Sequence, residues 1–168
     1  MESYNKLVRD YIGDKLKSKG LNPELKILTE EKYLQELLRK LVEESNEALC
    51  AGGTLTDLKK ELCDVLQVVE SIVTAFKLNL ESVPIRNFTI SESSKRSLLK
   101  MLVQRSREAE PLSYSVPDLE NLITVINNII DNIILVYNID RVALEAQKKL
   151  LEKEDGGFHK RLYLFSIH

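Results

Sequence analysis

Two pairs of acidic residues in the first half of the chain have a spacing that suits chemistry. Glu44 and Glu47 are three positions apart, and so are Glu61 and Asp64. On a helix this spacing places both side chains of a pair on one face. A short Gly-Gly turn lies between the two segments, so an antiparallel helical hairpin would aim four carboxylates at one point. Oxygen-rich sites of this kind suit Mg²⁺ or Mn²⁺.

The first acidic pair lies on a helix that we expect to begin after an N-cap at Thr29 and to end near Cys50. Its leucines recur with helical periodicity and form one apolar stripe. On a helical wheel Glu44 lies at the edge of that stripe, Glu47 lies further out and Glu43 lies on the far side. The wheel therefore directs Glu44 toward the protein interior.

The second pair lies on a helix expected from Asp57 to about Phe76, which is apolar around much of its circumference. Glu61 falls inside the apolar arc and Asp64 flanks it. A carboxylate against a core is costly unless a cation or hydrogen-bond donors meet it. Either pair alone is explained by a solvated helix face, but the two pairs together favour a bound metal ion.

The chain also contains an internal repeat. Residues 37–48 can be laid over residues 98–109, a shift of 98 − 37 = 61. Later in the chain Leu80 lies over Ile139, a shift of 139 − 80 = 59, which predicts a loss of about two residues in the second copy's long helix. We interpret the repeat as an old duplication of a helix–turn–helix unit, with copies at about 30–83 and 94–142.

The second copy has lost most of the acids. Glu108 remains opposite Glu47, but the positions of Glu43, Glu44, Glu61 and Asp64 are taken by Gln104, Arg105, Leu122 and Val125. Replacement of acids by Leu and Val suggests inward-facing positions that need an acid only where a metal is held. The sequence therefore predicts one functional metal site and one structural copy.

The remaining segments complete a mainly helical fold. We expect a helix over Tyr4–Lys19, a linker over 84–93, and a last helix over Arg141–Glu154. A small antiparallel pair of strands is expected from Glu24–Leu28 and Arg161–Ile167. The predicted fold is all-α in the main, with two helical hairpins packed as a four-helix bundle about a pseudo-two-fold axis.

Helix caps support these boundaries. Thr54 with Asp57, and Ser115 with Asp118, have the spacing of a capping box. Asp140 is expected to cap the last helix.

Composition restricts the class of protein. A chain of 168 residues with 43% hydrophobic and 30% charged residues fits one globular domain over residues 1–168. A net charge of −2 gives no basic footprint for nucleic acid and no attraction to an anionic membrane. The longest apolar run, 122–136, is interrupted by Asn and Asp, which excludes a membrane span. The polar N-terminus does not fit a signal peptide, so we expect a cytoplasmic protein.

The two acidic pairs and both ends of the chain resemble one family. EExxE followed by ExxD on the next helix is similar to the all-α nucleotide pyrophosphohydrolases. This MazG-like superfamily includes dimeric dUTPases and phosphoribosyl-ATP pyrophosphohydrolase. The segments Tyr4–Asp10 and Gly156–Arg161 look like the terminal signatures of a small bacterial branch of phosphoribosyl-ATP-pyrophosphohydrolase-type proteins. Here they flank two helical units, so the chain looks like a fused pseudo-dimer. Asp155 departs from the pattern, because an Arg is expected there.

The resemblance implies hydrolysis of a nucleoside triphosphate between the α and β phosphates, giving a monophosphate and pyrophosphate. Glu44, Glu47, Glu61 and Asp64 would hold Mg²⁺, which neutralises phosphate oxygens and lowers the pKa of a bound water. Mn²⁺ would serve in its place. Glu43 would orient that water or bind a second ion.

A nucleotide substrate also needs cations around its phosphates. Arg105 takes the place of a metal ligand in the second copy, and it either faces the site across the pseudo-two-fold axis or is a surface arginine. Lys40, four residues before Glu44, is explained by an intrahelical ion pair. The candidate phosphate contacts are Lys6, Arg9, Arg105, Lys160 and Arg161.

Three hypotheses remain open at this stage. The first is a Mg²⁺-dependent nucleotide pyrophosphohydrolase that clears unwanted nucleotides. The second is a binding or regulatory module that keeps the helical bundle and has lost turnover, and the third is a structural bundle that acts through protein contacts. In related enzymes another chain completes the bundle, so the fused chain is expected to be a monomeric pseudo-dimer or a homodimer.

Overall fold

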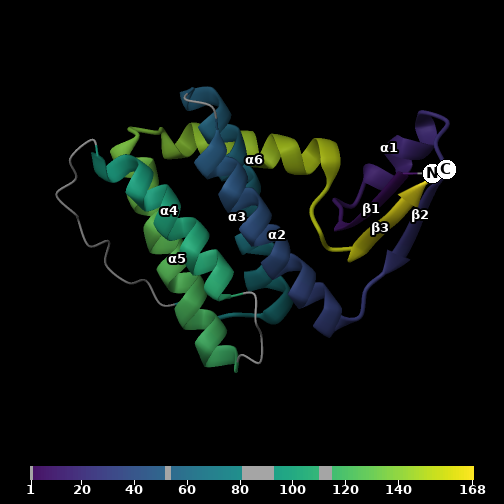
Figure 1. Ribbon diagram of the computed structural model, residues 1–168, viewed down its shortest axis with the longest axis horizontal. Helices are drawn as coiled ribbons and strands as arrows, with labels where there is room; N and C mark the ends of the chain where they lie inside the picture. The colour runs from purple at the N-terminus through teal and green to yellow at the C-terminus, as the bar shows by residue number, and fades with distance from the viewer. Residues whose placement is uncertain (1, 52–53, 81–92, 110–114) are drawn as a thin grey trace.

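The computed structural model describes residues 2–51, 54–80, 93–109 and 115–168. Within these residues the protein is mainly helical, with a small antiparallel sheet at one end (Figure 1). In chain order the elements are β1 (Glu2–Leu7), α1 (Ile12–Ser18), β2 (Pro23–Ile27), α2 (Glu30–Cys50), α3 (Leu55–Phe76), α4 (Ser93–Glu108), α5 (Val116–Val136), α6 (Arg141–Asp155) and β3 (Leu162–Ile167).

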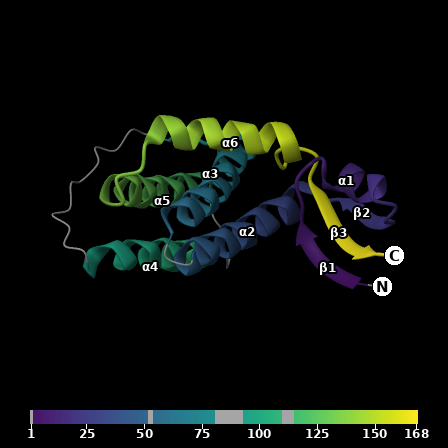
Figure 2. The same cartoon turned by 90° about the horizontal axis from the view of Figure 1, so that it is seen from above.

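Five of the helices form one body with a continuous apolar core. Helix α2 packs against both α3 and α4, α4 packs against α5, and α6 crosses α3. In Figure 2, α3 and α5 lie between α6 on one side and α2 and α4 on the other. Leu41, Leu62, Leu102 and Ile126, one from each of α2 to α5, are fully buried in the core. The prediction of a mainly helical protein is confirmed.

Capping residues set several helix boundaries where the sequence predicts them. The Thr54 hydroxyl accepts a hydrogen bond from the Asp57 N–H at 3.1 Å, and the Ser115 hydroxyl accepts one from the Asp118 N–H at 3.4 Å. The Asp140 carboxylate accepts bonds from the first N–H groups of α6. Thr29 is at the N-cap position of α2, but its side chain makes no capping bond. The linker expected over 84–93 lies almost entirely outside the described residues.

The beginning of the chain differs from the prediction. The helix expected over Tyr4–Lys19 is wrong for its first part, because residues 2–7 form the strand β1 and only 12–18 are helical. The register of β1 against β3 shifts between Ser3 and Lys6, and Asn5 between them has a φ of 48°. Such a bulge interrupts the alternation of side chains along a strand. The two-residue period that identifies a strand in a sequence is therefore missing here.

The sheet has three strands in the order β1-β3-β2, one more than predicted. The predicted antiparallel pairing of the segment 24–28 with the segment 161–167 is confirmed by β2 and β3. The C-terminal strand lies in the centre of the sheet, and both chain ends lie at this end of the molecule (Figure 1). We call the sheet, α1 and their connecting loops the terminal cap, residues 2–28 and 156–168.

Helix α5 is long enough and apolar enough to cross a membrane by length and composition alone, with a mean hydropathy of 1.4. The exclusion of a span from its interrupting polar residues was therefore too strong. About 44% of this stretch is buried inside the protein. Residues such as Ile123, Ile126 and Ile130 pack in the same core as α2 and α3, which is the arrangement of a core helix.

Candidate metal centre

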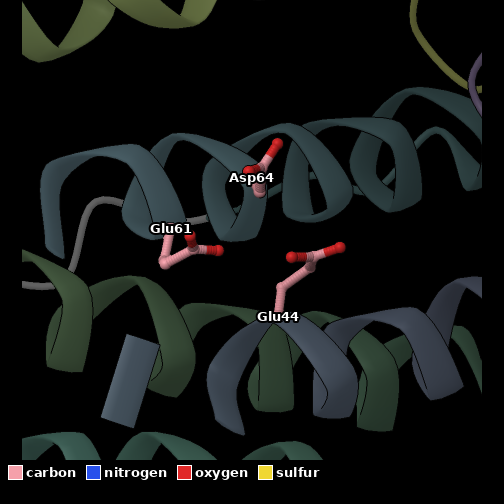
Figure 3. A group of neighbouring side chains, drawn as sticks. All are labelled: Glu44, Glu61 and Asp64. Carbon is pink, nitrogen blue, oxygen red and sulfur yellow. The ribbon is translucent and has the colours of Figure 1, made fainter. Parts of the chain in front are cut away.

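Three of the four predicted metal ligands meet between α2 and α3. Glu44 comes from α2, and Glu61 and Asp64 come from α3 (Figure 3). One carboxylate oxygen of each residue lies within 4.8 Å of the other two. The i, i+3 spacing on α3 puts its two acids on one face, and the packing of α2 against α3 brings Glu44 opposite them.

The other two acids of α2 lie further out. Glu47 is exposed, and its carboxylate lies beside that of Glu61, which together with partial burial raises the pKa of Glu47. Glu43 is half-buried and accepts a hydrogen bond from Lys40 at 3.0 Å. The structure therefore places Glu47 at the rim of the carboxylate cluster, whereas the Glu43 carboxylate is bound by Lys40.

Each of the three clustered carboxylates has a cationic neighbour. The Lys40 Nζ lies 2.5 Å from the Glu44 Oε1, and the Lys60 Nζ lies 3.0 Å from the Glu61 Oε1. The Arg9 guanidinium forms an ion pair with Asp64 through Nη2 and Oδ1. These three cations partly neutralise a cluster that would otherwise repel itself.

Burial dominates the electrostatics of the cluster. Glu44 is only 5% exposed, and burial raises its pKa to about 7 although Lys40 opposes the shift. The charges of Asp64 and Glu47 raise it further. Burial also raises the pKa of Asp64 and outweighs the opposing effect of Arg9. Their existing cation partners therefore do not fully compensate these carboxylates.

One oxygen in the cluster has no partner among the described residues. The Oε2 atom of Glu61 is buried and accepts no hydrogen bond. A buried carboxylate oxygen without a partner costs free energy, and a divalent cation is the kind of ligand that would satisfy it. Three carboxylates with one orphaned oxygen fit the preference of Mg²⁺ and Mn²⁺ for oxygen ligands.

Glu44 and Asp64 of the cluster line a pocket of about 430 Å³ between the helical body and the terminal cap, and Glu61 does not line it. A slightly larger pocket, about 450 Å³, lies between α2 and α4, but Glu44, Glu61 and Asp64 do not line it. The apolar residues that line the pocket at the cluster include Leu7, Val8 and Phe158. The charged residues that line it are Lys6, Arg9, Lys40, Glu44, Glu47, Lys60, Asp64 and Asp155.

The two terminal segments position Arg9 over the cluster. The Arg9 Nη1 donates to the Gly156 carbonyl at 3.4 Å, and its guanidinium lies 5.2 Å from the centre of the Phe158 ring. The Gly156 carbonyl also accepts a bond from Gln67 of α3 at 3.3 Å. The conformation of Gly156, with a φ of 80°, and its close approach to Asp10 leave no room for a Cβ. Glycine is therefore required at this junction.

The other predicted phosphate contacts are placed differently. Lys6 lines the pocket, as Arg9 does. Lys160 lies 5.3 Å from the centre of the Tyr11 ring, and Arg161 lies 5.4 Å from the Tyr33 ring, and neither residue lines this pocket. Arg105 is exposed and pairs with Glu108 at 2.6 Å, also away from the pocket.

Sequence reasoning missed several residues that build the site. Lys40 forms the expected intrahelical ion pair, but it also lines the pocket. The Asp10 carboxylate accepts hydrogen bonds from the N–H groups of His159 at 3.2 Å and Lys160 at 2.8 Å, which hold the two terminal segments together.

Asp155, the departure from the family pattern, pairs with Lys15 of α1. The sequence signal that could have suggested these contacts is the presence of a motif at each end of the chain, next to the two segments expected to pair as strands.

Comparison of the chain with models of protein families, with curated proteins and with solved structures found no match.

Proposed function

We propose that the protein is a Mg²⁺-dependent nucleoside triphosphate pyrophosphohydrolase that converts a nucleotide and water to a nucleoside monophosphate and pyrophosphate. The observation that carries this proposal is the cluster of Glu44, Glu61 and Asp64 with the orphaned Oε2 atom of Glu61. Acidic residues of α2 and α3 and residues of both terminal segments line one pocket, which supports the proposal.

The chain's own residues supply binding and orientation. Glu44, Glu61 and Asp64 would hold the cation, with Glu47 at the rim as a further ligand. A bound Mg²⁺ supplies charge neutralisation at the phosphates and activation of water. Lys6 lines the same pocket and offers positive charge to the triphosphate.

The pocket dimensions and composition suit a nucleotide. A volume of about 430 Å³ is within the range of small-molecule sites. Its charged residues suit phosphates and the cation, while its apolar residues, which include Val8 and Phe158, offer contacts for the base and sugar. In the proposed complex the phosphates lie next to the carboxylates.

We further propose that the helical body arose by duplication and has a pseudo-two-fold axis between α2 and α4. The Ser45 and Ser106 hydroxyls lie 3.0 Å apart and are separated by 61 residues, the shift found in the sequence repeat. Residues that contact their own equivalents lie at a two-fold axis. Asn46 and Arg107, also 61 residues apart, are neighbours across the same contact.

The ends of α3 and α5 support an unbroken shift of 61. Lys77 and Asn138 are equivalent at that shift, and both have a φ of 51°. The following N–H groups, of Leu78 and Ile139, donate to the carbonyls of Val73 and Ile134. This correspondence argues against the two-residue loss inferred from the sequence.

The proposal is tested by pyrophosphate release from a panel of nucleoside and deoxynucleoside triphosphates, standard and modified, with Mg²⁺ or Mn²⁺. Wild-type protein should release pyrophosphate only with the metal, and Glu61→Gln should lose that activity. Glu108→Gln is the matched control, because Glu108 lies at the equivalent of Glu47 on the exposed face of α4. Absence of release by folded wild-type protein on every substrate would refute the enzymatic proposal.

A second candidate function is a nucleotide- or metal-binding module without turnover. The specific observation that favours it is that Lys40, Lys60 and Arg9 already pair with the three carboxylates. Stabilisation of the fold by Mn²⁺ or nucleotide without pyrophosphate release would support this candidate.

A further inference from the structure

Arg9 holds a carboxylate that the proposed metal ion also needs. Its Nη2 contacts the Asp64 Oδ1, and Asp64 belongs to the group whose oxygens converge with those of Glu44 and Glu61. The ion pair is largely shielded from water, since the side chains of Arg9 and Asp64 are 13% and 17% exposed. A guanidinium and a divalent cation repel each other, so they compete for this carboxylate.

Besides its ion pair with Asp64 of α3, Arg9 is anchored within the terminal cap. The neighbouring Asp10 binds the backbone of His159 and Lys160, and the Arg9 Nη1 reaches the Gly156 carbonyl. A guanidinium that left Asp64 would therefore remain at the pocket. The contact also joins the cap to α3, so its loss would loosen the cap.

A phosphate group bound in the pocket would be a second partner for the released Arg9 guanidinium. Lys6, Lys40 and Lys60 line the same pocket as Arg9, together with four carboxylates. Once a divalent cation neutralises these carboxylates, the Lys and Arg charges favour an anionic ligand. The planar fork of Arg matches the oxygens of a phosphate group better than a Lys ammonium does. A phosphate group would thus replace Asp64 as the counter-ion of Arg9.

We propose that Arg9 exchanges partners during substrate binding. It holds Asp64 in the metal-free protein, yields that carboxylate to a divalent cation, and then binds a phosphate of the nucleotide. This inference rests on the proposed function and adds the order in which the cation and the nucleotide bind. Arg9 therefore weakens binding of the cation alone and strengthens binding of the nucleotide, so cation and nucleotide bind cooperatively through one side chain.

The first test measures binding of Mn²⁺ alone to wild-type protein, Arg9→Met and Arg9→Gln. Removal of the competing guanidinium should tighten Mn²⁺ binding by at least about fivefold, the lower range of coupling between linked ligands. Lys17→Met is the control, because Lys17 is an exposed residue of the same cap that does not line the pocket, and the substitution removes one positive charge. That control should leave Mn²⁺ affinity unchanged.

The second test measures binding of an α,β-methylene nucleoside triphosphate at saturating Mn²⁺. Arg9→Met and Arg9→Gln should weaken this binding by at least about fivefold. Opposite effects of the Arg9 substitutions on Mn²⁺ affinity and on analogue affinity distinguish partner exchange from a structural role, because damage to the fold would weaken the binding of both ligands. Should Arg9→Met fail to fold, the neutral and hydrogen-bonding Gln variant still decides the question.

A third measurement uses only wild-type protein. The Asp10 N–H donates to Gly157 at 2.8 Å and the Tyr11 N–H donates to Asp155 at 3.0 Å, so hydrogen exchange at these amides reports on the cap. Mn²⁺ alone should speed their exchange, and addition of the nucleotide analogue should slow it again.

The outcomes separate this inference from the proposed function. Equal or weaker Mn²⁺ binding in both Arg9 variants would overturn partner exchange and leave the metal site in place. Absence of Mn²⁺ binding in wild type and in both variants would overturn the proposed function, and the inference with it. Tighter Mn²⁺ binding together with weaker binding of the analogue is the result that supports the exchange.

Discussion

The two helical hairpins, α2–α3 and α4–α5, have the same frame but different surroundings. Both second helices begin with a capping box, at Thr54 and Ser115, and both end with a residue in the left-handed region. Among the described residues, the acidic cluster occurs in the first hairpin, where Arg9 and Gly156 of the terminal cap contact the side chains of Asp64 and Gln67. The acids therefore occur in the hairpin that the cap covers.

The comparison corrects one interpretation of the sequence. Replacement of Asp64 by Val125 in the second copy suggested that this position faces inward, but Val125 is 41% exposed. The side chain of Asp64, at the position that the proposed duplication makes equivalent, is 17% exposed. Contact with the cap is a feature that distinguishes Asp64 from Val125. What distinguishes the hairpin with the proposed metal site is thus the combination of acids and contact with the cap.

The strongest test of this difference makes the first hairpin resemble the second. Glu61→Leu should lower pyrophosphate release by about a hundredfold to a thousandfold, since single groups that stabilise transition-state charge are worth 10² to 10³. It should also raise the free energy of unfolding by about 1 kcal/mol, because it removes a buried oxygen that has no partner. Activity assays and urea denaturation check both effects.

The reverse exchange in the second hairpin is the matched control. Leu122→Glu places an acid on the half-buried face of α5 and should lower stability without changing activity. Loss of stability in Glu61→Leu would show that Glu61 supports the fold, and the contrast between the hairpins would then lose its functional meaning.

The next test removes the cover and leaves every acid in place. A Cβ on Gly156 would lie 2.8 Å from the Asp10 Cβ and 3.2 Å from its backbone N, in a conformation with a φ of 80°. Gly156→Ala should lower the free energy of unfolding by about 4 kcal/mol, the sum of backbone strain and a clash. Thermal or urea denaturation measures the change, and Mn²⁺ affinity reports whether the site is disturbed.

Gly20→Ala is the control for backbone strain alone. Gly20 belongs to the same cap and has a φ of 77°, but a Cβ there would meet nothing within 4 Å. Its cost should be about 1 kcal/mol. Equal effects of the two substitutions would show that the close approach between Gly156 and Asp10 contributes nothing.

The contrast between the hairpins also explains which features the sequence could predict. The capping boxes and the acidic pair on α3 depend on spacings of three residues along one helix, so they are local and the sequence predicts them. The convergence of Glu44 with that pair follows from one short hairpin. These predictions hold because few residues of the chain separate the side chains that come together.

The terminal cap could not be predicted in the same way. The contact between Arg9 and Asp64 joins residues 55 positions apart, and the bond from Lys160 to Asp10 joins residues 150 positions apart. Both depend on the central position of β3 in the sheet. The bulge at Asn5 hides β1 from a search for alternating residues. The pairing of β2 with β3 was predicted from local patterns, but the pairing of β1 with β3, in the segment just before Arg9, was not.

The raised pKa of Glu44 gives the first hairpin a pH-dependent stability. Because the pKa of about 7 in the folded protein exceeds the ordinary value of 4.5, the folded state binds this proton more tightly than the unfolded state. Stability of the metal-free protein should fall by about 2 to 3 kcal/mol as the pH rises from 4.5 to 7.5. The raised pKa of Asp64 acts in the same direction.

Urea denaturation across this pH range checks the slope, and Glu44→Gln should flatten it. Mn²⁺ should reverse the trend, because a metal ion needs the deprotonated carboxylate and binds more tightly as the pH rises. A slope that is identical in wild type and Glu44→Gln would mean that Glu44 is not the group responsible.

The smallest expected effects test whether the two hairpins are equivalent at their contact. Each hydroxyl of the Ser45–Ser106 pair is also positioned to donate to its own helix, at 2.6 Å to the Leu41 carbonyl and 2.9 Å to the Leu102 carbonyl. The two serines therefore have only two hydroxyl protons for three possible hydrogen bonds. Ser45→Ala and Ser106→Ala should each cost about 1 kcal/mol, measured by urea denaturation.

A double-mutant cycle separates the contact between helices from the bonds within each helix. Ser71→Ala is the control, because the buried Ser71 hydroxyl donates to the Gln67 carbonyl at 2.8 Å within α3. If a pseudo-two-fold axis relates the hairpins, the two single substitutions should agree within about 0.5 kcal/mol, and the double variant should cost less than their sum. A two-fold axis gives both serines the same environment at this contact. Unequal losses of unfolding free energy in Ser45→Ala and Ser106→Ala, together with a double variant whose loss equals their sum, would therefore argue against equivalence of the two hairpins.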